Sequence, residues 1–377
     1  MSYVPNPTNA AEPLDSVAAG TAAAEFRALK GRVNTLAGTL ASNARNKIIN
    51  GKMEVAQRGT SFAAASAYTL DRWELTNTSS AVATVTQQAD APSNNEFQYS
   101  YRYAVTTADT SIAAGDVLAI QQRIEGFNAR DLIGKTFTVS FWVRSSKTGT
   151  HCVAFRNGGV NRSYVIEYTV SASNTWEFKT VTLTGGLITA GTWDWTNGTG
   201  LIASWALAAG TTFQTTAGAW QTGNFLATSN QVNCLDSTSN IFAITGVQLE
   251  VGSVATPFEH RPIGVELALC QRYYERINLV ASSIAAVGHA ITSTTVIFCI
   301  PFQVPKRDRA ILALENSASI VALTSSGASA GGTLSLTQAN ENMARVDVSS
   351  ATGLVAGNAS GLLANGASQF IAFRSEL

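Results

Sequence analysis

The sequence is poor in charged residues, and it carries no excess of either sign. Charged residues make up 13% of its 377 residues, about half the ~25% of an ordinary soluble protein. Lysine plus arginine and aspartate plus glutamate both number 25, so the formal net charge is zero. Proteins that bind duplex DNA neutralise its phosphates with a surplus of basic side chains. The composition therefore argues against a nucleic-acid partner.

Long apolar runs and metal-ligand spacings are also missing. No stretch reaches the ~18 apolar residues of a membrane span, and Met1–Pro5 lacks the basic and apolar segments of a secretory signal. With three histidines and four cysteines in no CxxC pairing, we expect no metal site and no cofactor. We expect four free, buried thiols, at Cys152, Cys234, Cys270 and Cys299.

The N-terminal part divides into an arm and a helix. Residues 1–16 contain three prolines, which prevent a helix, so we predict an extended arm. In residues 17–45, apolar side chains alternate at spacings of three and four, the a/d pattern of a coiled coil. This seam consists of Ala19, Ala22, Phe26, Leu29, Val33, Leu36 and Leu40. A narrow seam favours association with a like helix, and the alternative is a lone amphipathic helix packed on its own domain.

From Asn46 onward the apolar period falls to two, which is typical of half-buried strands. The clearest predicted strands are Thr136–Arg144, His151–Arg156, Ser163–Val170, Glu177–Leu183 and Asn240–Glu250. Short strands at regular spacing, with turn residues between them, indicate an antiparallel sandwich or jelly roll over residues 46–262. Apolar residues are 45% of the chain, enough for a sizeable core.

Residues 263–377 are predicted to form a linking helix and a small C-terminal β domain. The helix is expected over Ile263–Ile277, with Leu267, Cys270 and Tyr274 as its apolar row. Predicted strands follow at Thr295–Phe302, Ala344–Val348 and Gln369–Phe373, with a turn-rich loop over Ser325–Thr333.

Four segments resemble those of tail-fibre and receptor-binding proteins of tailed bacteriophages. They are residues 22–36, the run Asn46–Gly59, Tyr68–Trp73, and Ile244–Arg261 followed by Glu266–Tyr274. The second is similar to the opening strand of a fibre domain. The resemblance implies a homotrimeric, mainly β fibre with a jelly roll like that of carbohydrate-binding modules. It also implies attachment of residues 1–16 to a tail, baseplate or portal-proximal protein, and location in the virion, which a chain without an export signal can reach.

One departure from that resemblance concerns calcium. Many such modules end their last strand with paired acidic residues that help to hold a structural calcium ion. Here the corresponding place reads Gly246-Val247-Gln248, with no carboxylate before Glu250. Calcium takes six to eight oxygen ligands, usually including carboxylates, so we do not expect it here.

Tryptophans cluster between residues 176 and 220 and offer a candidate glycan site. Trp193 and Trp195, two residues apart, would share one face of a strand, in a short exposed hairpin with Trp220 nearby. Exposed rings can stack on sugars, with Asn197, Gln214, Thr215 and Gln221 supplying hydrogen bonds. The alternative is that these rings lie in the core or in a subunit interface.

Three functions are compatible with this sequence. The first is a virion fibre that binds a host surface polysaccharide; the second is a head fibre or a capsid or collar decoration protein. The third, a glycan depolymerase, would need two carboxylates across the bond. The available pairs are Asp71 with Glu74, Glu167 with Glu177, and Glu250 with Glu259. Neighbouring basic residues suggest surface ion pairs, no hydrolase motif occurs, and we expect no catalysis.

Overall fold

The computed structural model describes residues 45–63, 65–93, 96–279, 284–313, 320–324, 327–328, 332–349, 351, 353–364 and 369–377. The chain divides into two compact units, residues 1–45 and 46–377. The expected arm (1–16) and coiled-coil seam (Ala19 to Leu40) lie outside the described residues. They stay predictions.

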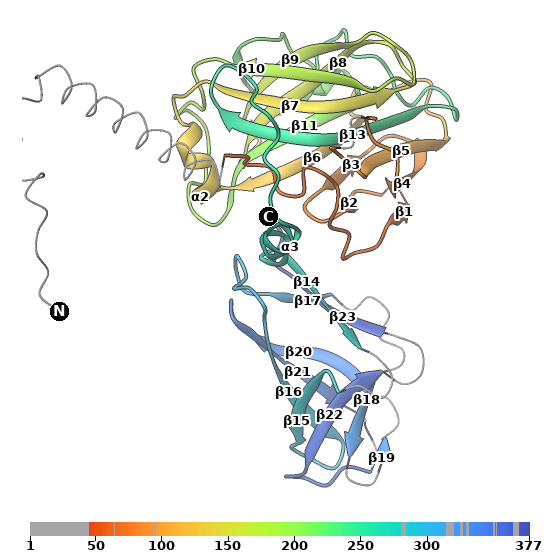
Figure 1. Cartoon of the computed structure of the whole chain (residues 1–377), viewed down its shortest axis with the longest axis vertical. Helices are drawn as coiled ribbons and strands as arrows, with labels where there is room; N and C mark the ends of the chain where they lie inside the picture. Colours follow the sequence, from red (N-terminus) through yellow and green to blue (C-terminus); the bar gives the residue numbers. More distant parts are fainter. Residues whose placement is uncertain are drawn as a thin grey trace, which may run out of the picture. The chain divides into compact units, whose positions relative to one another are not determined.

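Two antiparallel sheets make up the first part of the larger unit (Figure 1). The six-stranded sheet has the order β1(Ser61–Ala63), β4(Val82–Gln88), β5(Ser100–Thr107), β13(Ile241–Val251), β7(Phe137–Ser145), β10(Glu177–Leu183). The seven-stranded sheet has the order β12(Trp220–Thr222), β9(Arg162–Val170), β8(Gly149–Asn157), β11(Thr199–Ala209), β6(Val117–Glu125), β3(Glu74–Asn77), β2(Ala67–Tyr68). Between β6 and β7 lies the short helix α2(Gly126–Ala129), which leads into a 3₁₀ turn, Arg130–Leu132.

The core lies between these two sheets, and in most of their strands apolar side chains alternate toward it. In β7 the inward side chains are Phe137, Val139, Phe141 and Val143, all fully buried. The facing sheet contributes Trp205 from β11, whose ring lies 5.6 Å from that of Phe141. The architecture is therefore a mainly antiparallel β-sandwich, as the period-two pattern predicts.

The five predicted strands are confirmed, each to within one or two residues at its ends: they are β7, β8, β9, β10 and β13. The opening segment differs from the expectation. No strand forms over Asn46–Gly59, and the first described strand begins at Ser61. Asn50 and Met53 have φ angles of 58° and 59°, and such left-handed residues interrupt an extended chain. The Asn50 side chain closes the turn by bonding both the N–H and the C=O of Val55.

After the sandwich, α3(Ile263–Gln271) leads into two further sheets (Figure 1). A three-stranded sheet has the order β14(Tyr274–Leu279), β23(Gln369–Arg374), β17(Ile311–Ala313). A seven-stranded sheet has the order β19(Gly327–Ala328), β18(Ile320–Thr324), β22(Ala359–Ala364), β15(Ala286–Ala290), β16(Thr295–Pro301), β21(Met343–Ser349), β20(Thr333–Ala339). The predicted strands at 295–302, 344–348 and 369–373 are confirmed as β16, β21 and β23.

The predicted helix is too long. It ends at Gln271, six residues before Ile277, because Tyr274–Leu279 pairs as β14 with β23. Tyr273, not Tyr274, therefore joins Cys270 in the small apolar cluster under the helix. The predicted loop at 325–333 contains the two-residue strand β19, and β20 begins at its last residue.

Charged side chains connect the sandwich with the C-terminal part of the same unit. Arg72, which is 1% exposed, pairs with Glu376, and Arg58 reaches the other oxygen of the same carboxylate at 2.5 Å. Glu125 at the end of β6 accepts hydrogen bonds from Arg272 at 2.6 Å and from the Tyr273 hydroxyl at 2.7 Å. These pairs join residues that are far apart in sequence.

The cysteines are free thiols, as expected, but one expectation of burial is wrong. Cys152, Cys234 and Cys270 are buried, whereas Cys299 is exposed. In β16, Val296, Phe298 and Ile300 point inward, so the alternation of the strand turns Cys299 outward. Within the described ranges, no helix is long and apolar enough to cross a membrane.

Candidate functional site

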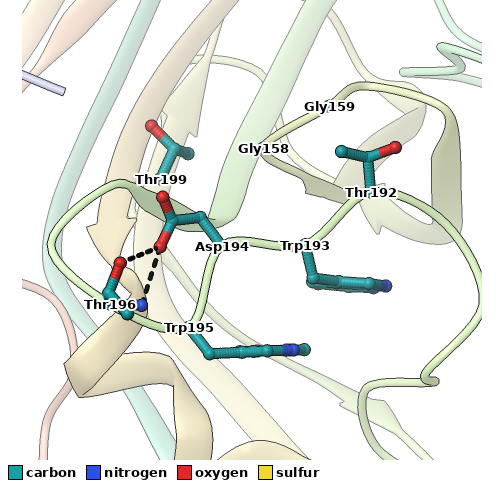
Figure 2. Close-up of a pocket in the computed structure, with 8 residues that line it drawn as sticks. All are labelled: Gly158, Gly159, Thr192, Trp193, Asp194, Trp195, Thr196 and Thr199. Carbon is teal, nitrogen blue, oxygen red and sulfur yellow. Dashed lines mark hydrogen bonds between the residues drawn. The ribbon is translucent and has the colours of Figure 1, made fainter.

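A hollow of about 680 Å³ opens where the β8–β9 turn meets the chain leading into β11. We call it the loop hollow (Figure 2). Its lining consists of Gly158, Gly159, Thr192, Trp193, Asp194, Trp195, Thr196 and Thr199. It thus combines two large rings with hydroxyl groups and one carboxylate.

Two glycines allow the walls of the loop hollow to approach one another. A Cβ atom on Gly158 would lie 2.1 Å from the Thr199 carbonyl oxygen, and one on Gly159 would lie 2.6 Å from Thr192 Cβ. The Asn157 side chain donates a hydrogen bond to the Thr192 carbonyl at 2.7 Å. The Asn161 side chain accepts one from the Thr192 N–H at 3.1 Å. The β8–β9 turn therefore fixes the position of the tryptophan loop.

The indoles of Trp193 and Trp195 stack on one another. Their ring centroids are 5.0 Å apart and their planes differ by 7°, as Figure 2 shows. Both side chains are half-buried and pack against the edge of the sandwich core. The expected strand hairpin is absent, since residues 192–196 form an irregular loop. The two rings do lie together, and they are neither fully buried nor fully exposed.

The indole N–H groups of the three tryptophans differ in their hydrogen-bond acceptors. Trp193 Nε1 donates to the Ala190 carbonyl at 2.9 Å, and Trp220 Nε1 donates to the Gly186 carbonyl at 3.1 Å. Trp195 Nε1 donates to no acceptor among the described residues. Since Trp195 is only half-buried, its N–H is available to solvent or to a ligand.

Trp220 supports the pair but does not line the loop hollow. Its ring meets that of Trp193 edge-on, with centroids 5.7 Å apart and planes at 76°. Tyr164 also meets Trp220 edge-on, with ring centroids 5.6 Å apart. The three predicted tryptophans are therefore brought together, with Trp220 behind Trp193.

Asp194 shapes the loop. Its carboxylate accepts from the Thr196 hydroxyl at 2.6 Å and from the Thr196 N–H at 2.7 Å, and these bonds lower the pKa of Asp194. Next along the loop, the Asn197 carbonyl accepts from Arg307 at 2.8 Å. The same guanidinium donates to the carbonyls of Ser375 and Glu376, both at 2.9 Å.

The polar residues predicted to supply hydrogen bonds beside the tryptophans do not line the loop hollow. The Gln214 side chain donates to the Ala209 carbonyl at 2.7 Å, Gln221 faces Thr216, and the Asn197 amide donates to the Arg307 carbonyl at 3.4 Å. None of them, nor Thr215, lines the loop hollow. Thr192, Thr196 and Thr199 take that place. The sequence analysis does not single them out, although each lies within four residues of a predicted tryptophan.

The three candidate carboxylate pairs are bound to other groups. Asp71 is buried and accepts two hydrogen bonds from Gln57, both 2.6 Å long. Glu74 pairs with Arg123 at 2.8 Å, and Glu177 pairs with Lys179 at 2.6 Å. Glu167 accepts from Thr228 and Asn230. Glu259 binds the Asn46 N–H at 2.6 Å. Each of these five carboxylates therefore has a hydrogen-bonding or ion-pair partner within the protein.

In β13, the last strand of the sandwich, the side-chain amide of Gln248 bonds several nearby oxygens. Gln248 Nε2 lies 2.9 Å from a Glu250 carboxylate oxygen, 3.3 Å from the Thr256 carbonyl, and 3.4 Å from both the Thr256 hydroxyl and the Pro257 carbonyl. A nitrogen with two N–H donors therefore occupies a cage of oxygens. Across the described part of the chain, no three His, Cys, Asp or Glu side chains form a metal-binding group.

No family model and no curated protein matches this chain. Among solved structures, it is similar to the enzymatically active domain of tailspike protein 4 of bacteriophage CBA120, with 17% identity and a TM-score of 0.29. That match covers 55% of this chain, which spans about a fifth (21%) of the tailspike structure. A family 11 carbohydrate-binding module from Clostridium thermocellum, in complex with a β-1,3-1,4-mixed-linked tetrasaccharide, has 10% identity and a TM-score of 0.29. That match covers 52% of this chain and 98% of the module.

Proposed function

We propose that this chain is a virion fibre protein that binds a host surface polysaccharide through the loop hollow. The observation that carries the glycan proposal is the stacked, half-exposed pair Trp193 and Trp195 in an open hollow. Sugars present apolar C–H faces for such rings and hydroxyls for hydrogen bonds. The Trp195 N–H and the threonine hydroxyls of the lining supply these bonds.

The low content of charged residues and the zero net charge of the chain agree with a ligand that is neutral or weakly charged. The only carboxylate in the lining, Asp194, is already bound by Thr196. The virion assignment rests on the resemblance of four sequence segments to phage fibre proteins. In this proposal, residues 1–16 attach to the particle, residues 17–45 form a trimer, and the β domains face the receptor. Linked weak sites in a trimer would gain effective affinity.

The test is adsorption of whole phage in the presence of purified protein. Wild-type protein should block adsorption, Trp195→Ala should block less, and Trp176→Ala should block like wild type. Trp176 is a matched control because it is half-buried and lines no part of the loop hollow. If both variants block adsorption equally well, Trp195 has no role in binding. No blocking by wild type would remove the receptor-binding function.

A head fibre or decoration protein is the alternative, since it would use the same arm and helix. Gold-labelled antibody on intact particles separates the two, because label on the head alone contradicts the tail assignment. A depolymerase would shorten the polysaccharide during incubation, and we expect its chain length to stay unchanged.

A further inference from the structure

A second, smaller hollow lies on the outer face of the six-stranded sheet. Its volume is about 230 Å³, and we call it the sheet-face hollow. Neighbouring strands contribute Ser140 and Trp142 from β7 and Phe178 from β10, while Phe97 and Phe258 come from loops. It shares no lining residue with the loop hollow.

A bulge in β13 creates this hollow. The pairing of β13 with β7 shifts register between Thr245 and Gln248, and Gly246 within the bulge has a φ of 59°. A Cβ atom at Gly246 would lie 2.7 Å from the end of the Phe97 ring. The bare glycine backbone therefore lets Phe97 settle against the strand, where Phe258 meets it edge-on at 5.2 Å.

The open wall of the sheet-face hollow is aromatic. Trp142 and Phe178 are direct cross-strand partners, and their ring centroids are 5.4 Å apart. Phe178 is 48% exposed and Trp142 is half-buried. These rings therefore leave apolar surface open to a ligand in the hollow.

The floor of the hollow carries an unused polar group. Ser140 is 4% exposed; its hydroxyl forms no hydrogen bond with any described residue, and its oxygen keeps contact with solvent. At the rim, the Glu96 carboxylate lies 3.1 Å from His260. The site thus offers rings for stacking and, beside them, a hydroxyl that is open to a ligand.

We propose that the sheet-face hollow is a second saccharide site, taking one pyranose unit. A sugar ring has the C–H face that Trp142 and Phe178 would cover and the hydroxyls that Ser140 would bind. The volume is below the ~300–1,000 Å³ of pockets for drug-sized ligands, which suits a single ring. The proposal does not require glycan binding at the loop hollow.

Saturation-transfer NMR on the full chain tests the proposal, with glucose, galactose, rhamnose and N-acetylglucosamine as probes. At least one probe should receive saturation from wild type, and Phe178→Ala and Ser140→Ala should each weaken its binding about two- to tenfold. Phe127→Ala should leave it unchanged, since Phe127 is another exposed phenylalanine (54%) that lines neither hollow. Near-UV circular dichroism verifies that each variant is folded.

The outcomes separate the two sites. Binding that survives Trp195→Ala but weakens in Phe178→Ala supports the sheet-face site even if the loop hollow binds nothing. Binding that is lost only in Trp195→Ala overturns the sheet-face site and leaves the proposed function standing. Absence of saturation for all four probes, or self-association that Phe178→Ala abolishes, also overturns it, the latter in favour of a protein partner.

Discussion

Arg72 and Glu376 form a buried ion pair across 304 residues of sequence. The guanidinium of Arg72 also lies 3.5 Å above the ring of Tyr273, and it donates to the Arg123 carbonyl at 2.6 Å. One side chain of the sandwich thus contacts a residue just after α3 and the last residues of the chain. The pair is a specific link between the sandwich and the C-terminal end of the chain.

Removing the acidic partner should destabilise the protein strongly. In Glu376→Gln, Arg72 would remain buried without its counter-charge, which costs about 3–5 kcal/mol. Urea unfolding measures the loss. Glu341→Gln, at an exposed position, should change stability by less than about 0.5 kcal/mol. A loss below about 1 kcal/mol for Glu376→Gln would show that water already solvates the pair.

Asp71 should make the fold less stable as the pH rises from 4 to 6. Burial raises the pKa of Asp71 to about 6, against the opposing effects of Arg58 and of the Gln57 hydrogen bonds. The folded state therefore holds this proton more tightly than the unfolded chain, whose pKa is about 3.9. This proton binding adds roughly 3 kcal/mol to the free energy of unfolding. The contribution is complete below about pH 3.9 and is lost as the pH rises through about 6.

Urea unfolding of wild type and Asp71→Asn between pH 4 and 7 checks this dependence. The variant should lack the decline that wild type shows, and Asp308→Asn, at a side chain 57% exposed, should retain it. If wild type instead gains stability relative to Asp71→Asn over this range, the carboxylate is stabilised in its charged form.

A side chain at Gly158 should separate the two stacked tryptophans. In Gly158→Ala the new Cβ would meet the Thr199 carbonyl, so the loop must move, at about 1–3 kcal/mol. The exciton signal of the Trp193–Trp195 pair in circular dichroism should fall. Gly115→Ala is the control, because that position faces open space. An unchanged signal in Gly158→Ala would mean that the rings stack without this close approach.

The coiled-coil prediction concerns residues that the structure does not describe. Replacing the seam residues Phe26, Leu29, Val33 and Leu36 with serine would remove the stabilisation from apolar burial. The loss is about 1.5–3 kcal/mol for each large side chain. Sedimentation should then show a smaller species or loss of soluble protein. Replacing Lys30 and Asn34 with serine should preserve the mass, because these polar residues lie between the seam positions and are predicted to face solvent. A trimer that survives the seam substitutions would place oligomerisation in the β domains.

Gln248 should make the fold insensitive to chelators. Because the Gln248 amide donates into the oxygen cage at β13, we expect EDTA to leave the Tm unchanged. Gln248→Leu should cost about 1–3 kcal/mol, whereas Gln98→Leu, at an exposed position, should cost little. A drop in Tm with EDTA would instead indicate a bound cation that supports the fold.

The strands of the sandwich could be predicted because their signal is local. In β7, Phe137, Val139, Phe141 and Val143 alternate with polar or half-exposed residues, and that alternation needs no knowledge of the partner strands. The opening segment could not be predicted in the same way. Its left-handed residues Asn50 and Met53 are held by contacts with distant parts of the chain, such as the bond from Trp73 Nε1 to the Asn50 carbonyl.

The candidate site was only partly predictable for the same reason. The spacing of Trp193 and Trp195 indicates that the rings share a side, and they do. Their stacking in a loop depends on Gly158 and Asn157, some 35 residues earlier. The sheet-face hollow depends on the register that places Phe178 beside Trp142. Neither relationship can be read from one stretch of sequence.

The guanidinium of Arg307 has a mechanical consequence for the tryptophan loop. It holds the Asn197 carbonyl on one side and the carbonyls of Ser375 and Glu376 on the other. A tensile load that enters the loop at Trp195 therefore has two parallel routes, one through β11 and one through Arg307 to the end of the chain. Load shared between two routes strains each of them less, so the loop would resist pulling better than its short backbone tether alone.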